Sequence, residues 1–331
     1  MQRILGALFL TGAFTMAGTS VIAARFVSGH IGTFTITAVS LFFAVIALLP
    51  LCWQKLIKTL RQKSLREWIP LFLQALFGIF LFRVLLLQGL MHTSAGEAGI
   101  LTGVTPAATA LMAMLWLKEP LYKTRILGLL STVTGIMMIQ GALLMGDGFS
   151  IGHFLGNLLV ICAALSESLF NIISRISSIT TTKSQTQVFD PIVQTTLVAG
   201  IALLLCLGPA LAEHPFSSLM SLNAFKWMSL VWYGVFVTAL AFIFWYAGIK
   251  RCEASTAAAF SGMMPFTSLI LSVIILREQA GWQQWAGGSM VIVGMLLTGL
   301  KQPTTGSGNL INIIDKGKIG ETSARSNKQT A

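Results

Sequence analysis

The chain has 331 residues, of which 55% are hydrophobic and 10% are charged. An ordinary soluble domain carries roughly 25% charged residues, so this composition all but excludes a soluble fold. The formal net charge of +11 would suit nucleic acid as a partner, but the positive residues gather in short segments between apolar stretches, which is typical of a membrane protein.

Apolar stretches long enough for a membrane-spanning helix, which needs about 20 residues, recur along the whole chain. We predict ten such spans, at residues 4–24, 31–53, 68–91, 95–117, 124–144, 151–174, 190–211, 227–249, 254–276 and 282–300. The period-two alternation of membrane strands is absent, and a backbone in lipid must satisfy its own hydrogen bonds, so we expect an all-α integral membrane fold. The first stretch follows Arg3 as a signal peptide would, but it is too long and too rich in threonine for that role.

The positive residues are distributed unevenly between the two sides of the predicted membrane. With a cytoplasmic N-terminus, most of them, including those of the loop predicted at 54–67, lie inside, whereas Arg25, Lys226 and Arg277 lie outside. Because positive residues favour the cytoplasmic side, we expect both termini in the cytoplasm and the protein in a bacterial plasma membrane, the inner membrane where there are two. Residues 302–331 are too polar to form a core and are predicted as a disordered cytoplasmic tail.

The chain also contains an internal repeat. A shift of 159 residues aligns, without a gap, Gly89 with Gly248, Gly103 with Gly262, Pro106 with Pro265, Leu117 with Leu276, Glu119 with Glu278, Gly128 with Gly287 and Gly135 with Gly294. We therefore predict one five-helix repeat at 1–145 and a second at 146–301. Because each repeat has an odd number of spans, the second is inverted relative to the first. Inverted repeats around a central cavity are typical of transporters that work by alternating access.

Longer motifs carry a family resemblance. They are TSAGEAGILTGVTPAATALMAMLWLKEPL at 93–121, WYAGI at 245–249 and ASTAAAFSGMMPFTSLILSVIILRE at 254–278. This pattern resembles the EamA-type family of the drug/metabolite transporter superfamily. The resemblance implies ten helices around a central cavity and small organic substrates that are often exported. One departure is visible, because many members carry Trp-Gly in the first span, where this chain has Ala17 and Gly18.

Two prolines fall near the middle of the fourth and ninth predicted spans. Pro106 and Pro265 each remove a backbone donor, which would free carbonyl groups about one turn earlier. Those carbonyls, with the small polar residues Thr102, Thr105 and Ser261, could face a substrate cavity. The alternative is that the small residues only allow close packing between helices.

Arg83 lies well inside a predicted span, where an arginine costs several kcal/mol or more unless water, an opposite charge or carbonyl groups satisfy it. Glu97 begins the returning helix and could pair with Arg83. Alternatively, Ser94 and Glu97 form a capping box, which would explain Glu97 without any function.

Glu167 lies within the sixth predicted span, and Ser166, Ser168 and Asn171 share its polar face. A carboxylate facing the interior could exchange a proton or bind a substrate amine. Alternatively, Glu167 is partly solvated near Arg175.

The remaining polar and aromatic residues give weaker signals. Trp245 and Tyr246 on the eighth span could line the cavity or simply pack. Glu119 ends a span and is predicted to anchor the membrane interface. Asp190 is predicted as a helix cap before Pro191.

No motif of an intramembrane enzyme is present in the sequence, and no metal or cofactor is expected. We therefore predict a secondary active transporter, in the exporting direction, of small organic metabolites such as amino acids or their derivatives. Its partners would be the substrate and the lipid bilayer, together with protons if transport is coupled to them. The alternative is a passive facilitator or channel. We expect a monomer, with a dimer as the alternative, and no nucleic-acid binding.

Overall fold

The computed structural model describes residues 2–27, 31–62, 65–90, 92, 101, 104–119, 122–139, 154–183, 190–275, 277 and 280–299. In these ranges the regular structure is entirely helical. The glycine-rich and charged tail predicted at 302–331 lies outside them.

The first half of the chain contributes α1 (Gln2–Gly18), α2 (Ser20–Val27), α3 (Thr33–Gln62), α4 (Leu65–Ala75), the π-helix η1 (Leu76–Leu81), α5 (Phe82–Leu90), α7 (Thr105–Trp116) and α8 (Lys123–Ile139). The second half contributes α9 (Phe154–Lys183), α10 (Pro191–Ala212), α11 (Pro215–Met220), α12 (Ala224–Trp232), the π-helix η4 (Tyr233–Leu240), α13 (Ala241–Ile249), α14 (Ala254–Ala259), the 3-10 helix η5 (Phe260–Gly262), α15 (Met263–Ile275) and α16 (Trp282–Gly299).

Within the described ranges, 6 helical stretches are long and apolar enough to cross a membrane. They are Thr33–Arg61, Glu67–Leu86, Phe154–Ser178, Pro191–Ala212, Ala224–Ile249 and Ala254–Ile275. Large apolar side chains are exposed on many of the helices, as lipid-facing surfaces require. The regular structure in the described part of the chain is thus entirely helical, with the long apolar helices of a membrane protein.

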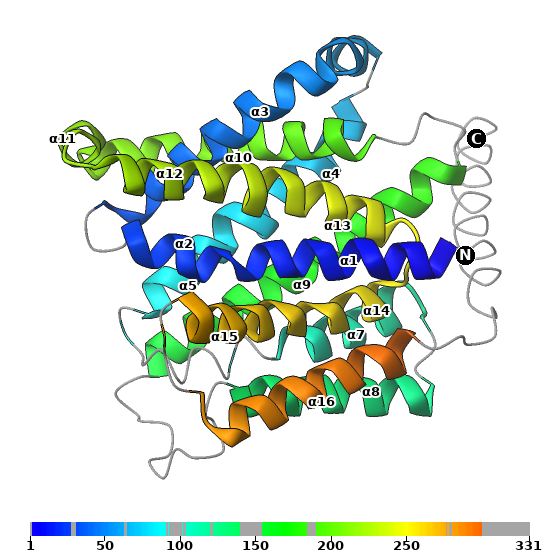
Figure 1. The fold of residues 1–331 in the computed structure, drawn as a ribbon. Helices are drawn as coiled ribbons and strands as arrows, with labels where there is room; N and C mark the ends of the chain where they lie inside the picture. Colours follow the sequence, from blue (N-terminus) through cyan, green and yellow to red (C-terminus); the bar gives the residue numbers. More distant parts are fainter. Residues whose placement is uncertain are drawn as a thin grey trace, which may run out of the picture.

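The helices form one bundle with a shared long direction (Figure 1). At one edge α3 packs against α10, and at the opposite edge α8 packs against α16. Between them α1 contacts both α13 and α15, while α9 contacts α5 and α7. The interior of the bundle is therefore bordered by helices that are far apart in the sequence.

Two sequence-based boundaries were wrong. The segment 54–67 was predicted as a loop, but α3 continues to Gln62, so Lys55, Lys58 and Arg61 lie on a helix. Helix α9 likewise continues beyond the predicted end at 174. Lysine, arginine and glutamine favour helices, and positive residues stabilise a helix C-terminus, so α3 extends past its apolar stretch. The segment between the predicted spans 190–211 and 227–249 contains the short helix α11.

Glycines allow α8 and α16 to touch through their backbones. A Cβ atom on Gly135 would lie 2.5 Å from the carbonyl oxygen of Gly287, and one on Gly294 would lie 2.5 Å from the carbonyl oxygen of Gly128. Contacts between small residues drive helix association in lipid, because no hydrophobic effect operates between helices there. This helix pair therefore depends on the absence of side chains at these positions.

Glu213, at the end of α10, caps the start of α3. Its carboxylate accepts hydrogen bonds from the backbone N–H groups of Phe34 at 3.1 Å and Thr35 at 2.8 Å, and from the Thr35 hydroxyl at 2.8 Å. A helix start leaves backbone donors unpaired, and inside a membrane they need a partner from the protein.

Glu119 has the same role in α14, which corrects its predicted role as an interface anchor. The carboxylate is buried and accepts from the N–H groups of Ala254 at 2.9 Å and Ser255 at 3.3 Å, and from the Ser255 hydroxyl at 2.8 Å. The preceding residue, Lys118, has a positive φ of 52°. The chain therefore turns sharply after α7 and directs Glu119 inward.

Candidate functional site

Arg83 is the second residue of α5, which begins where η1 ends, and it lies in the stretch Glu67–Leu86. Its Nη1 donates to the Thr37 hydroxyl of α3 at 3.0 Å, and its guanidinium carbon lies 5.1 Å from the ring centroid of Tyr233. The predicted partner, Glu97, lies outside the described residues. Both described partners are uncharged and meet only part of the donor capacity of a guanidinium group.

Glu167, Asn171 and Thr105 are brought together at the interface of α9 and α7. The Thr105 hydroxyl donates to Glu167 Oε2 at 3.3 Å, and Asn171 Nδ2 donates to the Thr109 hydroxyl at 3.3 Å. Ser168 strengthens the same interface by donating to the Thr105 carbonyl at 3.3 Å. The predicted polar face of α9 thus points towards another helix.

Glu167 lies on the side of α9 that is turned away from lipid. Leu158 and Leu165 of α9 are exposed and mark the lipid-facing side of this helix. Glu167 is two positions beyond Leu165, which places it about 200° further round the helix. Its side chain is only partly buried.

An aromatic cluster lies next to this carboxylate. Trp245 stacks on Phe170, with ring centroids 5.7 Å apart, and meets the edge of Phe14 at 5.6 Å. Phe170 is three positions after Glu167, so the two share one side of α9. Trp245 Nε1 is buried and has no hydrogen-bond partner among the described residues. Because a buried indole N–H normally finds an acceptor, this donor is a candidate ligand contact.

Tyr246 belongs to a buried network that the sequence analysis missed. Gln74 Oε1 accepts from the Tyr246 hydroxyl at 2.9 Å and from Gln194 Nε2 at 2.9 Å, and Gln74 Nε2 donates to the Ser177 hydroxyl at 3.1 Å. These residues come from α13, α4, α10 and α9. Amide side chains within apolar spans were the available signal, because such groups bond across helices in lipid.

The π-helices η1 and η4 were also missed. Ser166 donates to the Phe77 carbonyl of η1 at 2.9 Å, and Thr238 donates to the Tyr233 carbonyl of η4 at 3.0 Å. A Cβ atom on Gly78 would overlap the Phe170 ring, so that ring packs directly on η1. Such π segments occur often at functional sites, and here they adjoin Arg83 and the aromatic cluster.

The prolines act differently from each other. Pro106 was predicted at mid-helix, but α7 begins at Thr105, so Pro106 lies in the first turn, where no backbone donor is needed. Ser261 lies in the 3-10 helix η5, one turn before Pro265 of α15. The α-helix thus gives way to a 3-10 helix at the position, one turn before Pro265, where a free carbonyl group was predicted. Thr102 lies outside the described residues.

The family follows from a sequence comparison. The model of the EamA-like transporter family matches the chain twice, at residues 4–141 and 154–300. The chain belongs to the EamA-like transporter family. It is a multi-pass membrane transporter and not an enzyme.

Individual relatives agree with this assignment. The chain is 30% identical over 298 residues to the "Uncharacterized transporter YetK" of Bacillus subtilis, covering 88% of this chain and 86% of that one. It is 23% identical over 220 residues to a "Probable terminal-alkyne amino-acid exporter" of Streptantibioticus cattleyicolor, covering 66% and 69%. A solved crystal structure with 19% identity superposes with a TM-score of 0.70, covering 88% of this chain and 95% of that one, and supports the fold alone.

Proposed function

We propose that this protein is a secondary active exporter of amino acids or related small metabolites, driven by protons and working by alternating access. The observation that carries the proposal is the pair of ionisable groups, Arg83 and Glu167, within membrane-spanning stretches. In the described part of the chain, both have uncharged side-chain partners. Charged groups are expensive inside a membrane, so they normally mark a substrate or ion pathway.

The proposed substrate carries both an anionic and a cationic group. Arg83 suits a carboxylate, because guanidinium groups bind carboxylates well. Glu167 suits an amine or a proton. The buried N–H of Trp245 offers an additional donor, and the aromatic rings around it suit an apolar side chain. The probable amino-acid exporter among the relatives supports this substrate class.

The proposed architecture is ten spans in two inverted five-helix repeats around a central cavity. Two matches to one family model support the duplication. Lys118 and Arg277, which are equivalent in the repeat register, both have positive φ, at 52° and 56°. The equivalent third and eighth predicted spans each contain a π-helix. The 159-residue shift pairs Gly128 with Gly287 and Gly135 with Gly294. The contact of Gly128 with Gly294 and the contact of Gly135 with Gly287 are therefore equivalent in the two repeats.

The proposed orientation places both termini in the cytoplasm of a bacterial cell. Arg3, Arg125 and Glu253 line one pocket, so the starts of α1, α8 and α14 share one end of the bundle. Arg175 donates to the carbonyls of Ile249 and Lys250 at that same end. This concentration of positive residues supports a cytoplasmic position for it.

The proposal can be tested in proteoliposomes that contain the full chain. Uptake of a mixture of radiolabelled amino acids is measured with and without an imposed pH gradient. We expect the gradient to drive uptake, and Glu167→Gln to abolish that stimulation while leaving insertion intact, because only the titratable oxygen is lost. Glu67→Gln, at the start of α4, is the matched control and should retain gradient-driven uptake.

Each part of the proposal can fail separately. Uptake that only follows the amino-acid gradient would favour the passive facilitator. Gradient-driven uptake by Glu167→Gln would remove the coupling role from Glu167. Full transport by Arg83→Ala would remove the binding role from Arg83. If instead Arg83 only pairs with Glu97, Arg83→Ala combined with Glu97→Gln should recover the stability lost in Arg83→Ala.

A further inference from the structure

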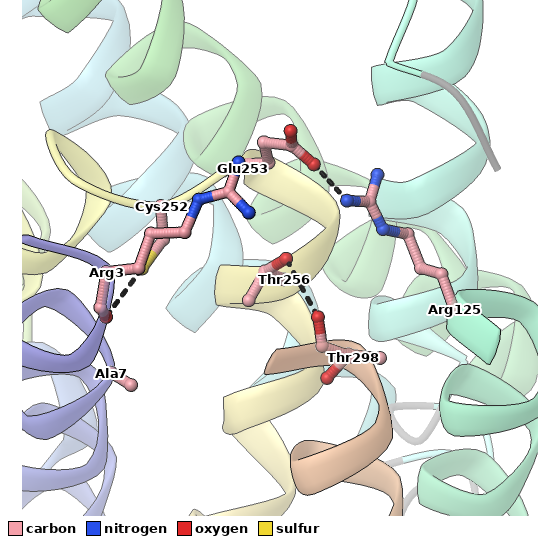
Figure 2. A pocket seen from close by; sticks show the side chains of 7 residues that line it. All are labelled: Arg3, Ala7, Arg125, Cys252, Glu253, Thr256 and Thr298. Atoms are coloured by element: carbon pink, nitrogen blue, oxygen red, sulfur yellow. Dashed lines mark hydrogen bonds and ion pairs between the residues drawn. The ribbon is translucent and has the colours of Figure 1, made fainter. Parts of the chain in front are cut away.

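A second polar site lies at the end of the bundle where the chain begins. It is a pocket between α1, α8, α14 and the end of α16 (Figure 2). Its lining residues are Arg3, Ala7, Arg125, Cys252, Glu253, Thr256 and Thr298. None of these belongs to the central groups around Arg83 and Glu167, so the proposed transport function does not account for this pocket.

The pocket carries an excess of positive charge. Arg125 forms an ion pair with Glu253, and Figure 2 shows Arg3 on the other side of Glu253 from Arg125. Arg3 is exposed, and its guanidinium group has no ion pair within the described ranges. The pocket therefore contains two arginines and one carboxylate.

The sulfur in the pocket does not offset this charge. Burial raises the pKa of the Cys252 thiol to about 11, so the thiol is neutral at neutral pH. The hydroxyl groups of Thr256 and Thr298 also line the pocket, but they already donate to the backbone carbonyls of Thr298 and of Gly294 and Met295, respectively. Helices α1 and α8 also begin beside the pocket, and their positive ends add to the field. A small anionic group with several oxygen acceptors matches the two guanidinium groups of the pocket.

The surface beside the pocket is apolar. Ile4, Leu8 and Ile126 are 69%, 64% and 42% exposed. Each directly follows a pocket residue, so each points about 100° away from the pocket around its helix. Exposed apolar side chains on these helices fit lipid chains, whereas the pocket beside them fits a headgroup.

We propose that this pocket binds the phosphate group of an anionic lipid, with Arg3 as the principal contact and Arg125 as the second. The assignment to the cytoplasmic leaflet rests on the proposed orientation, but the binding chemistry does not. A free phosphate ion has the same chemistry, and the apolar flank favours the lipid as its source. A lipid held here would join α1 to α8 and α14 at one end of the bundle.

The test is the thermal unfolding of the purified full chain in detergent at increasing concentrations of phosphatidylglycerol, phosphatidylcholine or inorganic phosphate. We expect phosphatidylglycerol to raise the unfolding temperature and phosphatidylcholine, whose phosphate is neutralised by its own choline, to have little effect. Arg3→Gln should raise the half-maximal concentration of phosphatidylglycerol at least about fivefold, because one charged contact is lost. Arg61→Gln, an exposed arginine at the end of α3, is the matched control and should leave it unchanged.

The outcomes separate the two phosphate sources. Stabilisation by inorganic phosphate at the same concentrations, abolished by Arg3→Gln, would keep the phosphate site but assign it to the free ion. Equal responses to phosphatidylglycerol and phosphatidylcholine would overturn the proposal, and so would equal affinities in Arg3→Gln and Arg61→Gln. Transport is not measured, so failure here is distinct from failure of the proposed function.

Discussion

The packing of α8 on α16 gives a sharp prediction at Gly135. In Gly135→Ala the new Cβ atom would lie 2.5 Å from the carbonyl oxygen of Gly287 and 2.9 Å from the backbone nitrogen of Val291. Val291 Cγ2 also lies 2.9 Å away, but the two backbone atoms cannot rotate out of the way as a side chain could. Because such contacts essentially never fall below 3.0 Å, the helices must separate by at least about 0.5 Å.

This separation would weaken the whole helix pair. Overpacking a close contact costs about 1–3 kcal/mol, so we expect Gly135→Ala to lower the free energy of unfolding by that amount. Gly200→Ala in α10 is the matched control, because a Cβ atom there meets nothing within 4 Å. That control should be neutral or slightly stabilising, because alanine favours a helix more than glycine does.

The assay is unfolding of both variants and the parent chain in one detergent, followed by loss of helical signal against temperature or denaturant. The expected order of stability is Gly200→Ala at or above the parent and Gly135→Ala below it. If the two variants were equally stable, the backbone contact between α8 and α16 would not limit stability, and the reasoning from the Cβ distances would be refuted.

Three further predictions concern other parts of the chain. In a cysteine-free background, an impermeant thiol reagent added outside cells should label Ser218→Cys but not Gln62→Cys; the reverse pattern would overturn the proposed orientation. Gln74→Leu should lower the free energy of unfolding by about 1–3 kcal/mol, because it leaves buried partners such as Tyr246 unsatisfied; an unchanged melting temperature would count against the network. Asp190→Ala should cost about 0.5–2 kcal/mol at neutral pH through loss of the α10 cap, and the difference from the parent should shrink under acidic conditions.

The pH dependence at Asp190 follows from its surroundings. Burial alone would raise the pKa of this carboxyl, but hydrogen bonds from Lys55 and the backbone N–H of Ile192 outweigh it and lower the pKa. The cap is therefore complete above the ordinary carboxyl range and is lost as pH falls through the lowered pKa. A difference between parent and variant that persisted after full protonation would show that the cap does not depend on the charge.

Hydrophobic length and local caps predicted several helices well. The span predicted at 190–211 is α10, Pro191–Ala212, and the span predicted at 282–300 is α16, Trp282–Gly299. Both signals, the length of the apolar stretch and the aspartate before a proline, can be read from neighbouring residues alone. The apolar length must match the membrane, and the Asp-Pro pair starts a helix. At the end of α3, polar residues that favour a helix follow the apolar stretch. The length of the apolar stretch therefore underestimates the length of this helix.

The candidate site was only partly predictable. Polarity within a span identified Arg83 and Glu167, since lipid penalises such residues in any fold. Their partners Thr37, Tyr233 and Thr105 lie on other helices, and the sequence alone does not say which helices meet. The π-helices were missed for a related reason, because their extra residue depends on contacts such as that of Ser166 with the Phe77 carbonyl.

The structure also distinguishes the acidic residues from one another by the partners that they hold. Glu119 and Glu213 each accept from two backbone N–H groups and one hydroxyl. Asp190 caps α10, and Glu253 pairs with Arg125. Protonation of any of these four would weaken a bond that holds a helix start or an ion pair. They are therefore poorly suited to repeated proton exchange during transport.

Glu167 is different, because its described partner is the hydroxyl of Thr105 at 3.3 Å. A hydroxyl can donate to a carboxylate and can also accept from a protonated carboxyl, so this contact survives in either protonation state. The same property predicts that Glu167→Gln folds normally, because the amide oxygen can still accept from Thr105. Gain or loss of a proton at Glu167 would thus alter the charge offered to the substrate without unfolding the interface of α7 and α9, which is the behaviour that a coupling residue requires.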